Sequence, residues 1–401
     1  MRIFKAGNQI NLDEEIRVAE RLLKENKIYI LETLDHLQHI AAYVAWKNVG
    51  GNIFVLNPQA FENDKTYLRE CAATLNVKDS IVFHTSGTTG RPKLVVHTEK
   101  QFNWGIRANT EQVGWNSNTR YLNLHPASTI AMWNMVISLA HHYHADLTLG
   151  DPSNVPNEIV GRSANIVPAI IDRLRQAGAN MDLSQSDFIT SGAGQVLDRH
   201  VQYLFDNGAK YFCGFYGLTE TFVPTLTRVS HHYDEHTICF NPVGINGDNV
   251  KLTDDGELLV FGPSLCENWQ TMKTIDGWFA TGDLFTVNNA GLLVYNGRND
   301  DIVKIHGYKA NLLELEQLIE EKTDLGRSLA LLKDDGYGEY IELFYSNQTQ
   351  VDTEKLTAVM VGQVPKYAFP KKYTYIKEIP TSLYGKKSRA KLKQHLEQNN
   401  E

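Results

Sequence analysis

One loop near residue 90 constrains the fold of this chain more than any other segment. The apolar run at 80–84 leads directly into a turn rich in glycine and hydroxyl groups, Thr85-Ser86-Gly87-Thr88-Thr89-Gly90-Arg91-Pro92-Lys93. Hydroxyls can donate hydrogen bonds to phosphate oxygens, glycines let backbone amides approach, and Lys93 supplies a positive charge. The loop therefore indicates a nucleotide site, with an ordinary solvated turn as the plainer alternative.

The loop differs from the common phosphate-binding pattern GxxxxGK[ST]. Lys93 follows Pro92, and Leu94 stands where that pattern needs a serine or threonine to hold a metal ion. The sequence therefore excludes an ordinary P-loop NTPase.

Length and composition set broad limits on the class of protein. A chain of 401 residues is too long for one compact core and suits two domains. The formal net charge is -8, with both signs spread along the chain, so nucleic acid is a poor candidate partner. The four cysteines lack any CxxC spacing, and no apolar run reaches the length of a membrane span. We expect a cytoplasmic protein.

Alternating helical and strand patterns indicate an α/β fold. Helical spacing at 12–25 and 34–48 alternates with strand-like runs at 28–31 and 53–56. The alternation continues through a strand at 121–124, a helix at 130–142, a strand at 145–149 and a helix at 168–177. This order is typical of sheets covered by helices.

Short strands separated by Asp/Gly turns dominate from 250 to 285. A charged segment at Arg298-Asn299-Asp300 follows, and then a helix at 312–322. We therefore predict a large N-terminal domain over 1–297, made of α/β subdomains and a β-rich section. A small, mobile α+β domain over 298–401 should follow it.

Four further segments carry chemistry. In 214–221 an aromatic ring, Tyr216, precedes the carboxylate of Glu220; the ring could stack on a purine and the carboxylate could hold Mg²⁺. The segment 276–284 ends near Asp283, which suits ribose hydroxyls, although taken alone this residue fits a turn cap better. The segments 297–307 and 380–389 lie at the proposed domain boundary and near the C-terminus, where a basic tail is the simple alternative.

In this order and spacing the five segments resemble the adenylate-forming superfamily of acyl-CoA synthetases, nonribosomal-peptide adenylation domains and luciferases. Beside the phosphate loop, the matching motifs are YGxTE at Tyr216–Glu220, TGD at Thr281–Asp283, GRxDxxxKxxG at Gly297–Gly307 and PxxxxGK at Pro380–Lys386. Ser191-Gly192-Ala193-Gly194 is similar to the loop on the adenine side. One such match could arise by chance, but five in series could not.

The resemblance implies that ATP activates a carboxylic acid as acyl-AMP, with release of pyrophosphate, before the acyl group passes to a thiol. It implies a catalytic Lys386, which bridges the acid and the α-phosphate, a Mg²⁺ ligand in Glu220, and a catalytic role for the adjacent Thr219. The implied nucleotide-binding residues are Thr85, Ser86, Gly87, Thr88, Thr89, Gly90, Lys93, Gly192, Ala193, Tyr216, Gly217, Asp283 and Arg298. The small domain would rotate about Asp300, withdraw Lys386 and present 304–309 to the thiol.

The chain departs from the family pattern at several positions. Leu94 replaces the glycine that usually follows the loop lysine, Glu99 stands where histidine is frequent, and Lys309 stands where arginine is common. The phosphate loop begins at residue 85, far earlier than in full-length relatives, which implies an abridged first subdomain.

Acceptor and acid stay open at this point. Coenzyme A is the preferred acceptor, and the phosphopantetheine of a carrier protein acting in trans is the nearest alternative. A non-catalytic nucleotide-binding protein is a third reading, which the intact Lys386, Glu220 and Asp283 oppose. Trp133 and Met135 favour an apolar or aromatic acid weakly, because no acidic residue is convincingly placed to pair with an α-amino group.

Overall fold

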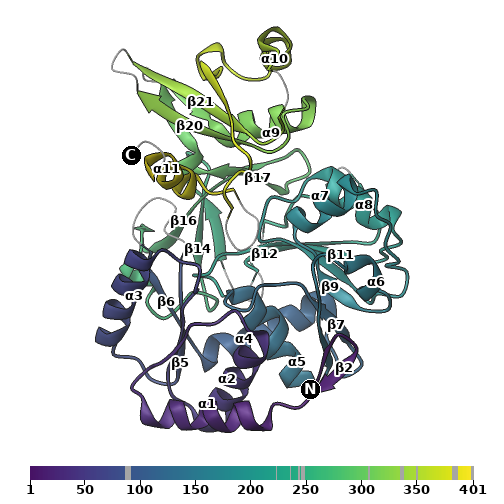
Figure 1. Cartoon of the computed structure of the whole chain (residues 1–401), viewed down its shortest axis with the longest axis vertical. Helices are drawn as coiled ribbons and strands as arrows, with labels where there is room; N and C mark the ends of the chain where they lie inside the picture. The colour runs from purple at the N-terminus through teal and green to yellow at the C-terminus, as the bar shows by residue number, and fades with distance from the viewer. Residues whose placement is uncertain are drawn as a thin grey trace.

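The computed structural model describes residues 1–85, 92–222, 224–234, 236–242, 244, 249–305, 308–334, 338–348, 351–381 and 387–398. Figure 1 shows the last part of the chain, green to yellow, above a larger body built from the preceding residues. The predicted α/β class is confirmed, with two mainly parallel sheets in the larger body. None of the helices in these ranges is both long enough and apolar enough to span a bilayer.

The first sheet carries the phosphate loop between its last two strands. Its strands, in spatial order, are β3 (Tyr29–Leu31), β4 (Ile53–Val55), β5 (Ser80–His84) and β6 (Leu94–Thr98). The first three are parallel, and β6 returns antiparallel to β5. Its helices are α1 (Asp13–Glu25), α2 (His36–Val49) and α3 (Glu62–Thr74). Successive side chains of a strand face opposite sides, so Ile81 and Phe83 face one core and Val82 packs with α3 in another.

The second sheet orders its strands β12-β11-β10-β9-β7-β8-β1-β2. Their bounds are β1 (Arg2–Lys5), β2 (Asn8–Ile10), β7 (Arg120–Asn123), β8 (Asp146–Leu149), β9 (Ser163–Asn165), β10 (Ile189–Ser191), β11 (Phe212–Tyr216) and β12 (Leu226–Ser230). Its helices are α4 (Glu99–Val113), η1 (Met132–Ile137), α5 (Ser138–Tyr143), α6 (Val155–Glu158), α7 (Pro168–Gln176) and α8 (Asp198–Asp206). Neighbours from β1 to β11 are parallel, with antiparallel strands at both edges. The β1–β2 hairpin was not predicted, because most of its residues are polar.

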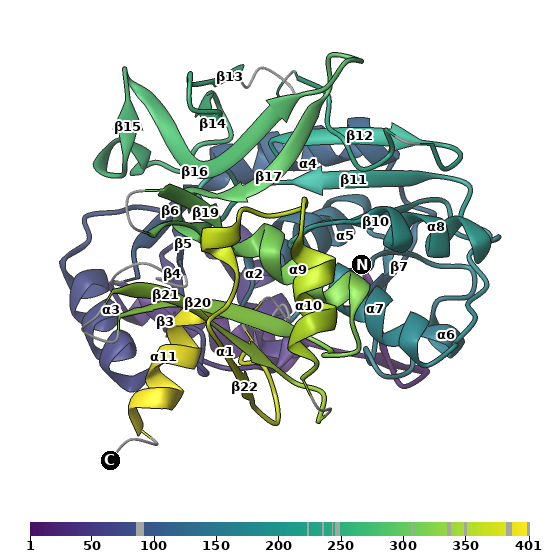
Figure 2. The same cartoon turned by 90° about the horizontal axis from the view of Figure 1, so that it is seen from above.

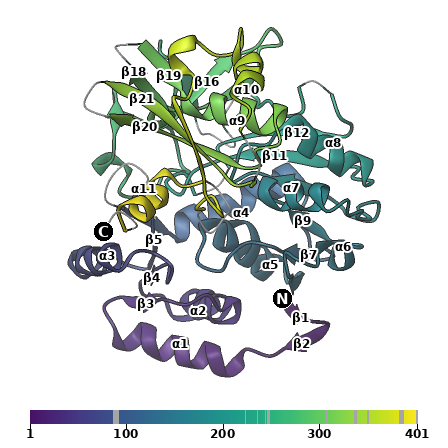
Figure 3. The same ribbon diagram turned by 45° about the horizontal axis from the view of Figure 1, so that its top comes forward.

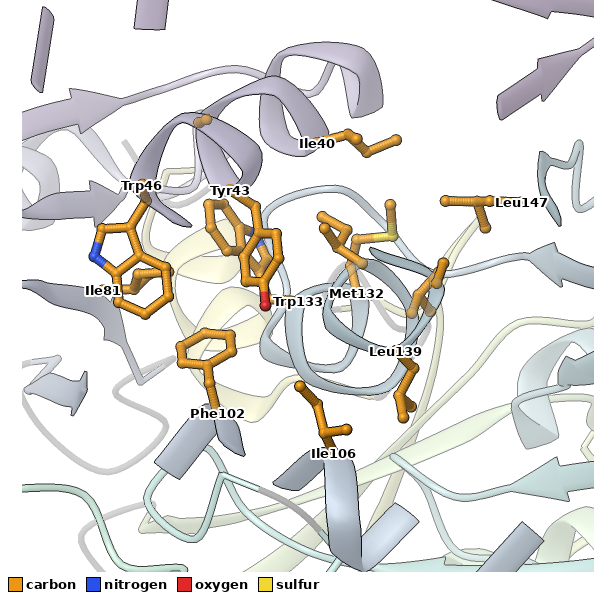
Figure 4. Packing of buried hydrophobic residues seen from close by; sticks show 14 of the residues in the cluster. Ile40, Tyr43, Trp46, Ile81, Phe102, Ile106, Met132, Trp133, Leu139 and Leu147 are labelled. Atoms are coloured by element: carbon orange, nitrogen blue, oxygen red, sulfur yellow. The ribbon is translucent and has the colours of Figure 1, made fainter. Parts of the chain in front are cut away.

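The main core lies between the two sheets. It is formed by α2, α4 and the η1–α5 segment, which Figure 3 shows between β3–β5 and β7–β9. Trp133 is fully buried there, and the ring of Tyr43 packs against both Trp133 and Phe102 (Figure 4). Its indole N–H donates to Nδ1 of His39 at 3.2 Å. Trp133 is therefore a core residue, and its weak support for an aromatic acid is lost.

An antiparallel sheet follows the second sheet and contacts it. Its strands are β13 (Asn249–Leu252), β14 (Glu257–Phe261), β15 (Thr274–Ile275), β16 (Trp278–Val287) and β17 (Leu293–Arg298), with the short helix η3 (Trp269–Thr271) before β15. Figure 2 shows β16 and β17 extending toward β11 and β12. The β-rich section therefore faces the end of the second sheet.

The C-terminal part has its own cores. Its elements are η4 (Asn299–Asp301), β18 (Ile302–Ile305), β19 (Tyr308–Asn311), α9 (Leu312–Lys322), β20 (Ser328–Asp334), β21 (Glu339–Tyr345), α10 (Thr353–Met360), η5 (Lys366–Ala368), β22 (Lys372–Tyr375) and α11 (Arg389–Gln398). Among the described residues, the buried members of each apolar cluster lie on one side of the proposed boundary. They lie either at or before Leu293 or at or after Ile305. This separation supports the boundary proposed at 298, which stays a prediction.

Replacing Trp133 tests whether this residue serves the core or a pocket. Trp133→Ala should lower the free energy of unfolding by about 3–5 kcal/mol, because it leaves a cavity and removes the donor to His39. Urea denaturation measures the change. Val287→Ala, at a side chain that is 57% exposed, should change stability by less than about 0.5 kcal/mol. A well-folded Trp133→Ala protein of wild-type stability would contradict the core assignment.

Candidate functional site

The predicted site residues gather where loops leave the carboxyl ends of strands. Thr85 follows β5, Gly192 follows β10, and the segment 217–222 follows β11. Asp283 lies in β16 and faces the end of β11 through Tyr216. Ligands of open α/β sheets bind at such carboxyl ends, so the location fits a small-molecule site.

The centre of the site is a buried carboxylate with several donors. Asp283 is 2% exposed and accepts a hydrogen bond from the Tyr216 hydroxyl at 2.7 Å. Arg298, its partner across β16 and β17, brings Nη1 to 3.2 Å from Asp283 Oδ1. The Tyr295 hydroxyl lies 3.5 Å from the same oxygen. Burial, and then the charge of Asp283, raise the pKa of Tyr216 well above 10, so its phenol remains a neutral donor.

The turn that carries Asp283 is fixed by two further contacts. Arg298 Nη2 donates to the carbonyl of Thr281 at 3.2 Å. Gly282 has φ +75°, and a Cβ there would lie 3.1 Å from Arg298 Nη2, so glycine fits both the backbone and the guanidinium. The sequence analysis assigned Asp283 and Arg298 to one site only through the motifs in which they occur. In the structure the two side chains are in direct contact.

Glu257 is a supporting residue that the sequence analysis missed. It is buried at the start of β14, where its Oε1 accepts from the Gly282 amide and its Oε2 accepts from Asn299 Nδ2, both at 2.9 Å. Lys273 Nζ lies 2.9 Å from Oε2. A charged residue opening the apolar run at 258–261 was the available signal. Glu257 thereby ties the turn at Gly282 to the segment that begins at Arg298.

The loop that carries Thr219 and Glu220 is held by its backbone. His97 Nε2 donates to the carbonyl of Thr219, and the Cys266 amide donates to the carbonyl of Glu220, both at 2.8 Å. Burial lowers the pKa of His97 to about 3, so the ring is neutral and carries its proton on Nε2. These bonds leave the side chain of Glu220 available, and β6 positions this loop through His97.

Glu220 fits a divalent cation. Its side chain lies deep in the protein but keeps part of its surface accessible. Burial raises the pKa of Glu220 above its usual value, although the charges of Arg298 and Lys93 oppose the shift. A carboxylate in this state gains from a nearby cation, and carboxylate oxygen is a ligand that Mg²⁺ prefers. The residue present therefore suits the expected ion.

The loop after β10 approaches β11 very closely. A Cβ at Gly192 would lie 2.5 Å from the carbonyl oxygen of Phe215, so any side chain there would displace the backbone. The next residue, Ala193, has φ +59°, a strained value for alanine. Gly192 and Ala193 thus lie beside the strand that ends in Tyr216, as expected for neighbouring parts of one site.

The base of the phosphate loop is closed by a pair of hydrogen bonds. The Thr85 amide donates to the carbonyl of Lys93 at 3.0 Å, and the Lys93 amide donates to Thr85 Oγ1 at 3.1 Å. His84 Nδ1 donates to the carbonyl of Thr85 at 3.1 Å, while its Nε2 accepts from the Asn57 amide. The loop therefore starts from a fixed stem. The expected ligands Ser86, Gly87, Thr88, Thr89 and Gly90 lie outside the described residues.

The remaining expectations divide between described and undescribed positions. Lys386 lies outside the described residues. Asp300, the expected hinge, is an exposed residue in η4, and its hinge role stays a prediction. Glu99 begins α4 and forms an ion pair with Lys47 of α2. The carbonyl of Leu94 accepts from Asn268 at 2.9 Å.

Comparison with known proteins identifies the family. The model of the AMP-binding enzyme family matches residues 23–266, more than half of the chain, so the protein belongs to this family. The chain is 24% identical to a 2-succinylbenzoate–CoA ligase of Listeria monocytogenes over 339 residues, which cover 78% of this chain and 69% of the relative. It is 22% identical to surfactin synthase subunit 3 of Bacillus subtilis over 400 residues, covering 91% of this chain and 31% of the relative.

A solved structure confirms the fold. The chain superposes on O-succinylbenzoate coenzyme A synthetase from Bacillus subtilis, in complex with ATP and magnesium ion, with a TM-score of 0.81. The match covers 98% of this chain and 96% of that one, at 17% sequence identity. The predicted architecture of an adenylate-forming enzyme is therefore confirmed.

The raised pKa of Glu220 predicts how stability depends on pH. Ionising this buried carboxylate costs free energy, so Glu220→Gln should stabilise the protein without Mg²⁺. The advantage should be absent below the ordinary carboxyl pKa of 4.5 and should grow as pH rises through the raised value. Thermal unfolding across pH measures it.

Magnesium provides the control for this prediction. At pH values above the raised pKa of Glu220, Mg²⁺ should raise the unfolding temperature of the wild type. The unfolding temperature of Glu220→Gln should stay the same when Mg²⁺ is added. Equal stabilisation of both proteins would contradict the assignment of Glu220 as the ligand.

Proposed function

We propose that this protein activates a carboxylic acid with ATP as acyl-AMP, releases pyrophosphate, and transfers the acyl group to the thiol of coenzyme A. The observation that carries the proposal is the Tyr216–Asp283–Arg298 cluster next to Glu220 at the end of β11. Family membership supports the nucleotide, and the CoA ligase among the relatives supports the acceptor.

In the proposed nucleotide site each group of residues holds one part of ATP. Asp283 with Arg298 faces the ribose, and Tyr216 with the loop at Gly192 faces the adenine. The loop from Thr85 to Lys93, with Gly217, serves the phosphates. Mg²⁺, when bound to Glu220, neutralises charge on the leaving pyrophosphate. The fixed stem at Thr85 supports this arrangement, because preorganised donors stabilise developing charge without moving.

The proposed chemistry proceeds in two displacements at one site. A carboxylate oxygen of the acid attacks the α-phosphorus, and the bond to the departing pyrophosphate breaks. Lys386 holds the two anions together, and Thr219 lies beside the ion ligand Glu220. In the second step the thiolate attacks the acyl carbon and AMP leaves. A rotation about Asp300 would exchange Lys386 for the segment 304–309 between the steps.

The acid is proposed only as a class. An apolar or aromatic acid is the first class to test, and a cytoplasmic location is the matching proposal for the protein. The class comes from the sequence interpretation alone, because Phe215 and Phe222, which flank the 217–221 loop, belong to the same buried core as Trp133. The identity of the acid is for the assay to decide.

Exchange of labelled pyrophosphate into ATP tests the proposed first step. With a panel of apolar, aromatic and dicarboxylic acids, at least one acid should drive exchange in the presence of Mg²⁺, because acyl-AMP formation is reversible. Glu220→Gln and Asp283→Asn should each slow it by about 10²-fold or more. If AMP binds but no acid drives exchange, the protein is a nucleotide-binding protein without this activity.

A carrier protein is the second candidate acceptor. The similarity to a surfactin synthase subunit favours it, since adenylation domains in such enzymes load carrier-bound phosphopantetheine. Preformed acyl-AMP supplied with either coenzyme A or a phosphopantetheinylated carrier protein distinguishes the two. We expect thioester formation with coenzyme A at least about tenfold faster. A preference for the carrier protein would transfer the proposal to that acceptor.

A further inference from the structure

We propose that Glu316 of α9 is a positioning residue for the adenylation step, because it fixes the cations that follow Lys386 in the sequence. The inference rests on the proposed function, in which Lys386 bridges the acid and the α-phosphate. It concerns only described residues around that lysine.

Glu316 is a fully buried carboxylate with three separate partners. Its Oε2 lies 2.7 Å from Lys387 Nζ. Its Oε1 accepts from the guanidinium of Arg389 and, at 2.9 Å, from the amide of Ala330 in β20. One carboxylate therefore joins α9, β20 and the segment that begins at Lys387.

Backbone bonds join the residues on the two sides of 382–386, which we call the stem. Thr381 and Lys387 form an antiparallel bridge, and the Ser388 amide donates to the carbonyl of Pro380 at 2.9 Å. Lys391 Nζ donates to the carbonyl of Thr381 at 2.9 Å. Lys387 follows Lys386 directly in the sequence, so the anchored stem includes the residue next to the expected catalytic lysine.

Lys387 is committed to this anchor. Its ammonium lies between Glu316 and Glu320, at 2.7 and 3.0 Å, and its side chain is 15% exposed. Lys386, the last residue of the PxxxxGK motif, is followed directly by Lys387. These contacts give Lys387 a structural role. Lys386 is then the lysine left to act on substrate.

Arg389 connects the stem to the proposed hinge. Its Nη1 bonds Asp301 Oδ1, and its Nε donates to the carbonyl of Ala330 at 3.1 Å. Asp301 Oδ2 in turn accepts from the amide of Arg298, at 3.4 Å. A continuous set of contacts thus runs from Glu316 through Arg389 to the arginine that pairs with Asp283. The stem and the Tyr216–Asp283–Arg298 cluster are therefore positioned by one connected set of contacts.

Stability alone gives a poor reason for such a cluster. Buried ion pairs cost desolvation, and apolar residues of similar volume often serve stability as well or better. The guanidinium of Arg389 is planar and bonds Asp301, Glu316 and the carbonyl of Ala330 at once. Meeting all three partners strictly fixes the orientation of the Arg389 side chain. Positioning the stem explains why charged groups occupy this place.

Separate assays of the two half-reactions test the proposal. Glu316→Gln should lower kcat for ATP–pyrophosphate exchange by about 10²-fold, with KM for ATP within about threefold, because a misplaced catalytic group costs rate without costing binding. Thioester formation from supplied acyl-AMP should stay within about threefold, since Lys386 takes no part in it. Arg389→Lys keeps the positive charge but loses the forked guanidinium group. It should therefore also slow pyrophosphate exchange and leave thioester formation nearly unchanged. Lys386→Ala shows how far the exchange rate falls when the catalytic lysine is removed, and it serves as the reference for the other variants.

Glu342 of β21 provides a matched control in the same domain. It is also buried, and its carboxylate bonds Lys372, at 2.9 Å, and Thr374 of β22. Glu342→Gln should lower the unfolding temperature while both half-reactions stay within about threefold. If Glu316→Gln slows both half-reactions equally, or neither, the positioning role is wrong.

A second readout does not depend on any acid. Native-state trypsin should cleave after Lys387 and Arg389 about tenfold faster in Glu316→Gln than in the wild type or Glu342→Gln, because the stem opens locally. Equal cleavage rates would overturn the inference. Failure of the wild type to exchange pyrophosphate with any acid would instead overturn the proposed function, and trypsin would still decide the role of Glu316 in holding the stem.

Discussion

The pairing of Asp283 with Tyr216 and Arg298 is the interaction on which the site depends. A carboxylate buried at this depth is tolerated only when cations and hydroxyl donors surround it. Its donors come from different elements: Tyr216 ends β11 of the second sheet and Arg298 ends β17 of the β-rich section. Satisfying one charge therefore fixes how two sheets meet, and it does so at Arg298, the first residue of the proposed small domain.

The two central carboxylates of the site have opposite environments. Asp283 is compensated by an arginine and a phenol, whereas burial of Glu220 outweighs the positive charges near it. Environment sets the role of each: a compensated carboxylate can orient a neutral polar group, and an undercompensated one gains by holding a cation. The same chemical group can thus suit ribose at one position of the site and a metal ion at another.

The sequence predicted those parts of the fold and site whose signals are local. The helix at 312–322 was predicted at its observed bounds, and the structure shows that the Asn311 side chain caps it. β11 runs from Phe212 to Tyr216 although Gly214 interrupts the apolar pattern, so its end is not evident from the sequence. His97, Glu257 and Glu316 were missed, since the partners of their side chains lie far along the chain. Only tertiary contacts reveal why such residues are buried.

The origin of the oxygen atoms in AMP tests the central claim most directly. The acid that serves as substrate would be labelled with ¹⁸O in its carboxylate and converted with ATP and coenzyme A, and the AMP would be analysed by mass spectrometry. If the acid attacks the α-phosphorus, one labelled oxygen must appear in AMP and none in pyrophosphate. Unlabelled AMP, or label in inorganic phosphate alongside ADP, would contradict activation as an acyl-adenylate.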